Sequence, residues 1–383
     1  MVHLLLAVIY ISFISLGLPD GLLGAAWPSI YTELNTPISY AGIISTIICV
    51  GTIASSLLSD RLTHRLGSGL VTAISVTMTA VALIGFSFSN SFWILCLLAV
   101  PYGLGAGCVD ATLNNYVALH YPSRHMSWLH CMWGIGASAG PYLMGIILSG
   151  KQHWTRGYLY IGIMQIILSS VLLISLPLWK KAEASPNSKP LSMKQIITIP
   201  GVKQIIITFF CYCALEQTAA LWSASYFSLH VGRTPEDAAT LGSLFFLGIT
   251  VGRAISGFIT LKLNTGSMIR LGFIIIAIGI LLLLLPLGNW CPVIGVLMVG
   301  LGCAPIYPSL MHATPDHFGA ERSQAIMGIQ TASAYVGTAI MPPVFGLIAN
   351  HISISFLGPY LLVMLILMVM AYRKLSQICA KTA

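Results

Sequence analysis

Residues 274–287 read IIIAIGILLLLLPL, a run in which no side chain is charged or polar. A strand of a membrane barrel would alternate apolar and polar residues with a period of two, so this run indicates a helix that is apolar on every face. A helix needs about 20 mostly apolar residues to cross the hydrocarbon core of a bilayer. Extending the run toward its N-terminus gives such a segment at residues 268–287, and we predict a membrane-spanning helix there.

Similar runs recur along the whole chain, which is 57% hydrophobic and 7% charged. A soluble domain is about 25% charged, so this composition excludes an ordinary soluble fold. The first run has no Lys or Arg before it and no small-residue cleavage site, so we expect a first span rather than a signal peptide. We predict an all-α membrane protein with twelve transmembrane helices, near residues 4–30, 39–58, 69–88, 92–119, 127–149, 158–178, 204–229, 239–261, 268–287, 293–313, 324–348 and 356–372.

One long polar stretch, Lys180–Lys203, separates the sixth and seventh predicted spans. It is rich in lysine, proline and serine, which indicates a linker. The predicted organisation is therefore an N-terminal six-helix bundle over residues 1–179, a cytoplasmic linker over 180–203, and a C-terminal six-helix bundle over 204–383.

The two predicted halves share features in the same order, which indicates two pseudo-symmetric bundles. The matched features are Asp20 with Glu216, Gly103-Leu104-Gly105 with Gly300-Leu301-Gly302, and Pro141 followed by Gly145 with Pro342 followed by Gly346. Transporters built from such repeats bind their solute near the bilayer midplane, where the repeats meet.

The net charge of +8 does not predict nucleic-acid binding, because the basic residues lie in the breaks between spans and form no single patch. Most of the 18 Lys and Arg fall on one side; Lys151, Arg156 and Arg233 fall opposite, and Arg253 lies within a span. The positive-inside rule then predicts that both termini lie in the cytoplasm, and we expect a multi-pass protein of the cell (inner) membrane.

Three of the ten acidic residues, Asp20, Asp110 and Glu216, lie inside predicted spans. An ionised acid at mid-bilayer costs about 2.5 to 3.5 kcal/mol, so we interpret the set as a proton or ion site facing a water-filled cavity. The alternative is a set of acids hydrogen-bonded for helix packing. Pro19 frees backbone groups beside Asp20, and irregular backbone at membrane depth is tolerated where it lines a cavity.

Helical spacing places Gly17, Asp20, Gly24 and Trp27 on one face, and Gly103, Gly107, Asp110 and Asn114 on another. The glycines clear space beside each acid, for a solute or for a neighbouring helix. Amide, imidazole and aromatic side chains near the acids are candidates for solute binding, with packing or interface anchoring as the alternative; they are Asn114, Asn115, His130, Trp133, Gln217, Trp222, Tyr307 and Gln330.

Residues 59–67, with Asp60, Arg61 and Arg65, read as a tight basic turn between the second and third spans. We interpret these three residues and Arg253 as a candidate cytoplasmic gate; the alternatives are enforcement of orientation for the turn and snorkelling to the headgroups for Arg253. His120, His125 and His130 are five residues apart and scatter around a helix, so no metal site is predicted. The nine cysteines are scattered and read as packing residues.

The stretch Asp60–Gly67 resembles the cytoplasmic loop motif of the major facilitator superfamily. Further stretches are similar to the fucose permease and glucose/mannose:proton symporter (FHS) family: Leu18-Pro19-Asp20, Gly103-Leu104-Gly105 through Asp110 to Asn114, Leu215-Glu216, and Gly300-Leu301-Gly302 to Pro305 and Pro308.

The resemblance covers nearly the whole chain and implies a twelve-helix fold, alternating access, and uptake of monosaccharides with protons. In the fucose permease, an aspartate of the first span and a glutamate of the fourth serve proton coupling and substrate binding. Asp20 and Asp110 fall at those places, with aspartate instead of glutamate at the second. Glu216 resembles the seventh-span glutamate of the glucose-type members.

We therefore expect a secondary transporter for a small polar solute of the monosaccharide class, coupled to protons through Asp20, Asp110 and Glu216. The alternative is proton-coupled efflux of drugs or another metabolite, which fold cannot separate from uptake. The sequence contains no nucleophile paired with a base and no nucleotide or zinc signature, so we do not expect an enzyme. The expected partners are the solute and the lipid bilayer; we expect a functional monomer, no cofactor, and protons or sodium as the coupling ion.

Overall fold

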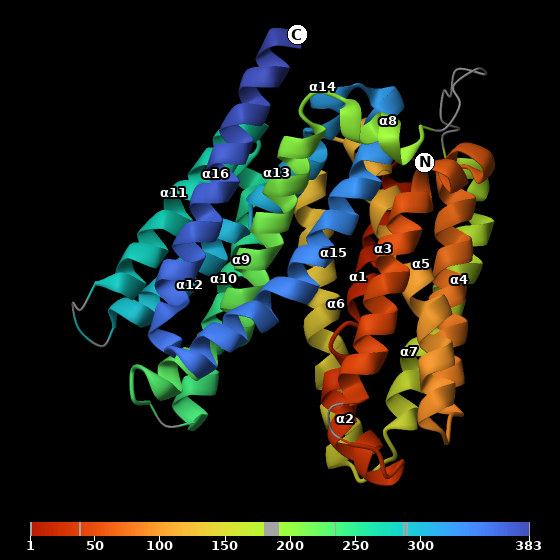
Figure 1. The fold of residues 1–383 in the computed structure, drawn as a ribbon. Coiled ribbons are helices and arrows are strands. Elements are labelled where there is room, and N and C mark those ends of the chain that lie inside the picture. Colours follow the sequence, from red (N-terminus) through yellow and green to blue (C-terminus); the bar gives the residue numbers. More distant parts are fainter. Residues whose placement is uncertain are drawn as a thin grey trace. The chain divides into compact units, whose positions relative to one another are not determined.

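The structure is a computed structural model that describes residues 2–37, 40–179, 191–233, 235–285, 288 and 290–382 (Figure 1). The described residues form helices and no strand. Among them, 12 helical segments are long and apolar enough to cross a membrane, which confirms the predicted number of spans. The first part of the predicted linker, 180–190, lies outside the described residues.

The helices follow the predicted spans closely. The first six spans are α1 Val2–Gly17 with α2 Leu22–Glu33, α3 Ala41–Leu66, α4 Ser68–Ser87, α5 Phe92–His120, α6 Ser123–Ser149 and α7 Thr155–Ile174. The last six are α9 Val202–Leu229, α10 Pro235–Ile259, α11 Thr265–Leu284, α12 Cys291–Cys303 with α13 Ile306–His312, α15 Ala320–His351 and α16 Leu357–Thr382. Short elements between them are η2 Leu176–Leu178, α8 Met193–Thr198, α14 Thr314–Phe318 and η3 Ile354–Phe356.

The first span is interrupted where the sequence places Pro19. Proline lacks a backbone N–H, and turn-type bonds from Asp20 N to Gly17 O and from Leu22 N to Pro19 O replace the regular helical pattern. Gly17, Asp20, Gly24 and Trp27 therefore do not share one continuous helical face, and that prediction is wrong. Asp20 lies in the turn between α1 and α2 instead.

The chain divides into two compact units. Unit 1 contains Met1–Tyr116, Leu129–Pro190 and Met327–Ala332, and unit 2 contains Val117–Trp128, Leu191–Ile326 and Ser333–Ala383. The predicted six-helix boundaries at residues 179 and 204 stay a prediction.

Within unit 1, α4 packs along α7, and the buried Gln165 side chain of α7 connects three helices. Its amide oxygen accepts from Thr79 Oγ1 of α4 at 2.8 Å, and its Nε2 donates to Ser15 O of α1 at 2.8 Å. Within unit 2, α12 packs against both α10 and α11, and α9 packs against α16. These contacts include α1, which ends just before Asp20, and α9, which carries Glu216.

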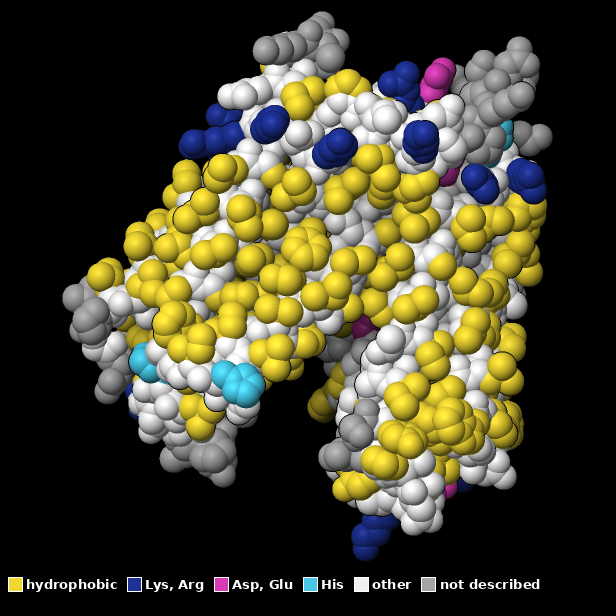
Figure 2. Space-filling model, in the orientation of Figure 1, with side chains coloured by type: hydrophobic (Ala, Val, Ile, Leu, Met, Phe, Trp, Pro, Cys, Tyr) yellow, Lys and Arg dark blue, Asp and Glu magenta, His cyan; other side chains and the backbone are white. Residues whose placement is uncertain are grey.

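Large apolar side chains cover much of the surface, among them Phe88 at 76% exposed, Trp93 at 70% and Ile174 at 80%. Figure 2 shows the same excess of hydrophobic side chains on the face in view. In water such a surface would drive aggregation, whereas in a bilayer it is the surface that contacts lipid.

Candidate functional site

Asp20 and Trp133 form the first polar contact of the candidate site. Trp133 Nε1 of α6 donates to Asp20 Oδ2 at 2.8 Å. Asp20 is exposed and Trp133 is half-buried. The interruption of the helix at Pro19 turns this carboxyl toward α6, so the contact follows from the local sequence of the first span.

Two glycines allow α6 to approach the Asp20 turn closely. A Cβ atom on Gly136 would meet the Ile14 carbonyl oxygen, and one on Gly140 would meet the Leu18 carbonyl oxygen. Any larger residue would push the helices apart, which is the usual reason for small residues at membrane helix interfaces. Leu18, which Gly140 contacts, lies two residues before Asp20. The close approach of α6 at this point therefore brings the Trp133 indole within hydrogen-bond distance of the Asp20 carboxyl.

A buried chain of hydrogen bonds lies deeper in unit 1. Asn114 Nδ2 donates to Asp110 Oδ1 at 2.8 Å and to the Asp110 backbone oxygen at 2.9 Å, one helical turn earlier on α5. His130 Nε2 of α6 lies 3.0 Å from Asn114 Oδ1. Asp110 is 8% exposed, Asn114 0% and His130 6%, so water contributes little to this network.

Asp20 and Asp110 lie within electrostatic reach of each other, and Tyr102 of α5 is likewise within reach of Asp20. Asn115, the next predicted solute-binding residue on α5, is buried at 6% exposure. Unit 1 thus brings together Asp20, Asp110 and their hydrogen-bond donors.

Glu216 is held differently, because its partner carries a charge. Arg253 Nη2 of α10 donates to Glu216 Oε1 of α9 at 3.3 Å, and the side chains are 5% and 9% exposed. The sequence predicted Arg253 as a cytoplasmic gate residue and Glu216 as a proton site, and the structure places the two in one ion pair within unit 2. A buried charge is tolerated where an opposite charge and hydrogen bonds compensate it.

Aromatic rings line the same region of unit 2. Tyr307 of α13 packs against Tyr212 and Phe209 of α9, with ring centroids 5.8 Å and 5.2 Å apart. Tyr212 OH donates to Cys303 O at 3.0 Å, at the end of α12. Tyr307 itself is half-buried.

The remaining predicted solute-binding residues differ in their surroundings. Trp222 Nε1 donates to Pro342 O at 3.0 Å, and a Cβ on Gly346 would lie 2.8 Å from the Trp222 ring. These contacts give Trp222 a packing role between α9 and α15. Gln217 is half-buried, whereas Gln330 of α15 is fully buried.

Residues 59–66 form the last turns of α3, so the prediction of a tight turn over 59–67 is wrong. No residue before Gly67 breaks the helix, and Gly67, with φ of 80°, makes the turn alone. Arg61 and Arg65 are exposed and Asp60 is half-buried. The role of these three residues as a gate stays a prediction.

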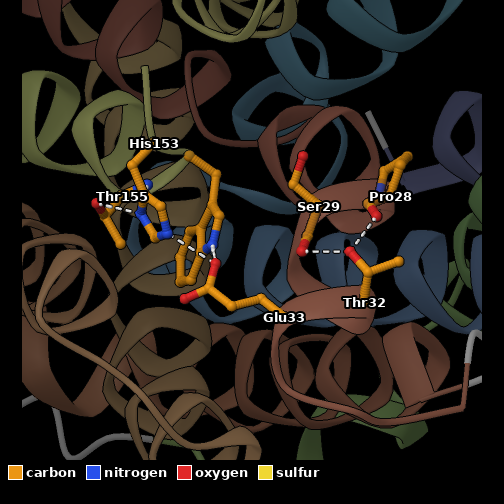
Figure 3. A network of polar contacts seen from close by, with 7 residues as sticks. Pro28, Ser29, Thr32, Glu33, His153 and Thr155 are labelled. Atoms are coloured by element: carbon orange, nitrogen blue, oxygen red, sulfur yellow. Dashed lines mark hydrogen bonds and ion pairs between the residues drawn. The ribbon is translucent and has the colours of Figure 1, made fainter. Parts of the chain in front are cut away.

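The sequence did not reveal a polar network at the end of the first span (Figure 3). Glu33 Oε2 lies 2.7 Å from His153 Nε2 and accepts from Trp154 Nε1 at 2.7 Å, while His153 Nδ1 lies 2.8 Å from Thr155 Oγ1. Trp154 is buried, so Glu33 satisfies an indole N–H that water cannot reach. The only sequence signal for this network was the acidic residue Glu33 at the end of the apolar first span.

Among the described residues, no group of three or more His, Cys, Asp and Glu side chains is placed to hold a metal ion. The chemistry that this arrangement offers is hydrogen bonding and proton exchange by carboxyl groups at membrane depth. Twelve apolar helices with such groups inside them define a multi-pass membrane transporter.

The chain belongs to the Major Facilitator Superfamily, whose family model matches residues 9–291 and 205–377. It is 22% identical over 320 residues to the glucose/mannose transporter GlcP of Bacillus subtilis, covering 78% of this chain and 77% of GlcP. It is 23% identical over 383 residues to the sodium-dependent glucose transporter 1 of Danio rerio, covering 89% of this chain and 64% of that protein.

The fold is similar to that of the Escherichia coli fucose:proton symporter FucP in its outward conformation. The TM-score is 0.81 at 14% identity, over 96% of this chain and 98% of FucP. At this identity the likeness establishes the twelve-helix transporter fold, and the substrate must be argued from the site.

Proposed function

We propose that this transporter moves a monosaccharide together with a proton by alternating access. The observation that carries the proposal is the exposed Asp20 carboxyl in the interrupted first span, bonded to the Trp133 indole. A carboxyl group facing hydrocarbon would be costly, so its exposed side faces water. There it is open to proton exchange, beside an aromatic ring on which the apolar face of a sugar can stack.

The division of roles follows from the partners of each acid. Asp20 is the main protonation site, because its donor is uncharged and its carboxyl is exposed. Asp110 and Glu216 serve both coupling and solute binding. Asn114, Asn115, His130, Gln217, Tyr307 and Gln330 supply polar groups toward the solute, with the Trp133 and Trp222 rings as stacking or packing surfaces.

Sugar is the proposed solute because GlcP is a glucose/mannose transporter and FucP a fucose:proton symporter by name. The name of the Danio rerio relative keeps sodium as the alternative coupling ion. With 12 spans both termini fall on one side, and the lysine and arginine bias favours the cytoplasmic side of a cell membrane.

The test uses purified protein in proteoliposomes with a panel of monosaccharides, an imposed pH gradient, and sodium present or absent. Wild type is expected to accumulate one or a few sugars when the outside is acidic, without sodium. Asp20→Asn is expected to retain sugar binding and lose pH-driven accumulation, since the amide cannot carry the proton.

Asp316→Asn is the matched control, because Asp316 lies in α14 between spans, and it is expected to transport as wild type. Full pH-driven accumulation by Asp20→Asn, or accumulation driven by sodium alone, would contradict proton coupling through Asp20. Outward movement of many unrelated compounds would favour efflux instead.

A further inference from the structure

An open groove of about 400 Å³ lies on unit 1 where α4, α5 and α7 meet. It is lined by Ile74, Thr77, Met78, Val81, Pro101 and Leu173. The four residues from α4 follow the spacing i, i+3, i+4 and i+7, so they share one face of that helix. Its exposed rim is aliphatic and consists of Ile74 at 41% exposure, Val81 at 54% and Leu173 at 49%. Since all three helices are membrane spans, a rim of this kind contacts hydrocarbon.

The lining has no hydrogen-bond donor for an occupant. Thr77 is its only polar side chain. Thr77 Oγ1 donates its hydrogen to Ala73 O at 2.7 Å and is also hydrogen-bonded to Ser169 Oγ of α7, so the hydroxyl is used within the protein. A sugar or another polar solute would lose its hydrogen bonds to water here without replacement, whereas a hydrocarbon chain needs no such bonds.

The depth of the groove matches the chain region of one leaflet. Helix α4 has 20 residues and is about 30 Å long, which is about the thickness of the hydrocarbon core. Ser68 therefore lies near one edge of the core, and Ile74 and Val81 lie about 9 and 20 Å from that edge along the helix. The midplane is about 15 Å from the edge. An acyl chain that enters from the Ser68 side reaches the groove.

Two arginines lie at the same end of α4. Gly67 alone connects α3 to α4, so the last turns of α3 lie next to Ser68. Arg61 and Arg65 are exposed and are four residues apart on one face of α3. Asp60 is the only acidic residue of α3 and is half-buried, so it offsets one of the two charges at most. Basic side chains at this level attract anionic headgroups.

We infer that the groove binds an acyl chain of an anionic phospholipid whose headgroup contacts Arg65 and Arg61. An apolar groove alone would give little preference in a bilayer, because lipid tails surround every lipid-facing side chain. The preference comes from a groove in one leaflet together with two cations at the headgroup level of that leaflet. No groove residue belongs to the candidate solute site, so the inference does not depend on the solute or the coupling ion.

The test uses the purified protein in phosphatidylcholine vesicles with a trace of a phospholipid that carries a photoreactive diazirine in one acyl chain. The probe is either phosphatidylglycerol, which is anionic, or phosphatidylcholine, which has no net charge. Labelled peptides are identified by mass spectrometry after illumination. We expect the anionic probe to label residues 74–81 at least about fivefold more than the neutral probe, since one basic residue near the surface changes the affinity for an anionic lipid by about that factor.

Two pairs of variants separate the chain from the headgroup. Ile74→Trp places a large ring on the rim and is expected to abolish the excess labelling of α4. Ile167→Trp is its matched control, because Ile167 of α7 is 60% exposed and does not line the groove. Arg65→Gln is expected to lower labelling by the anionic probe about fivefold and to leave the neutral probe unchanged. Arg322→Gln, which replaces an exposed arginine of unit 2, is expected to change neither.

Equal labelling of residues 74–81 by the two probes in wild type would overturn the proposal. So would labelling by the anionic probe that is spread evenly over all lipid-facing helices, or equal effects of the two tryptophan variants. No loss of labelling in Arg65→Gln would overturn the role of the arginines. All four variants replace exposed side chains, and if Ile74→Trp does not fold, Val81→Trp blocks the same groove from another position on its rim.

Discussion

The buried ion pair between Glu216 and Arg253 allows the sharpest prediction. Their side chains are 9% and 5% exposed with 3.3 Å between Oε1 and Nη2, so neither charge has much access to water. Removing one partner of such a pair costs about 3 to 5 kcal/mol, mostly because the other charge is left uncompensated. Replacing both partners leaves no lone charge buried, and hydrophobic replacements of similar volume are often neutral or stabilising.

The two single variants should differ in their dependence on pH. In Glu216→Gln the arginine is left alone, and because a guanidinium does not lose its proton in proteins, the cost of about 3 to 5 kcal/mol should be the same at every pH. In Arg253→Met the carboxyl is left alone and can bind a proton to become neutral. Its cost should be large at about pH 8 and smaller at about pH 5.

The assay is thermal unfolding of the purified protein in lipid or detergent, followed by tryptophan fluorescence at both pH values. Wild type and Glu216→Gln/Arg253→Met are expected to unfold at similar temperatures, well above either single variant. Additive losses in the double variant would refute the reasoning, because independent sites add and a coupled pair does not. If the stability of the two single variants depended equally on pH, the reasoning that Glu216→Gln leaves a lone guanidinium and Arg253→Met leaves a lone carboxyl would be refuted.

Two further predictions concern glycine packing and a histidine outside the spans. Gly140→Ala should cost about 1 to 3 kcal/mol and weaken pH-driven transport, because its methyl group meets the Leu18 carbonyl beside the Asp20 turn. Gly145→Ala on the same helix meets nothing within 4 Å and should be neutral or slightly stabilising by thermal unfolding; equal effects would contradict this packing. Burial lowers the pKa of His317 in α14 below its ordinary 6.5, although Asp316 partly offsets this. The unfolded chain then binds the proton more readily, so thermal stability should fall as the pH drops below about 6.5, and fall less in His317→Gln; identical pH profiles would contradict it.

Much of the fold could be predicted because hydropathy is a local property. A run such as 274–287 predicts a membrane span without reference to the rest of the chain, and among the described residues 12 helices lie where such runs were found. The interruption at Pro19 was also local, since one missing N–H suffices to break the pattern. The end of α3 was predicted too early, because charged residues such as Arg61 and Arg65 are good helix formers and no breaker occurs before Gly67.

The partners of the site residues could not be predicted, because they depend on how separate helices pack. Nothing in the spacing of Glu216 and Arg253, 37 residues apart, indicates that α9 and α10 bring them together. Trp222 was a candidate for solute binding with packing as the alternative, and its indole N–H donates to a backbone oxygen that Pro342 supplies. A carbonyl of this kind has no sequence signature.

The acidic residues of the two halves have different hydrogen-bond partners, and this difference affects where a proton binds. Asp20 and Glu216 occupy matching places in the two halves of the sequence, yet the first accepts from an uncharged indole and the second is paired with a guanidinium. Protonating Glu216 would leave the buried Arg253 charge uncompensated, whereas protonating Asp20 leaves no charge behind. The same proton therefore costs less in the N-terminal half, and we expect Asp20 to be protonated first, whereas Glu216 takes part in coupling only when its pair with Arg253 separates. Exchanging the roles would require the C-terminal pair to separate each time a solute is carried.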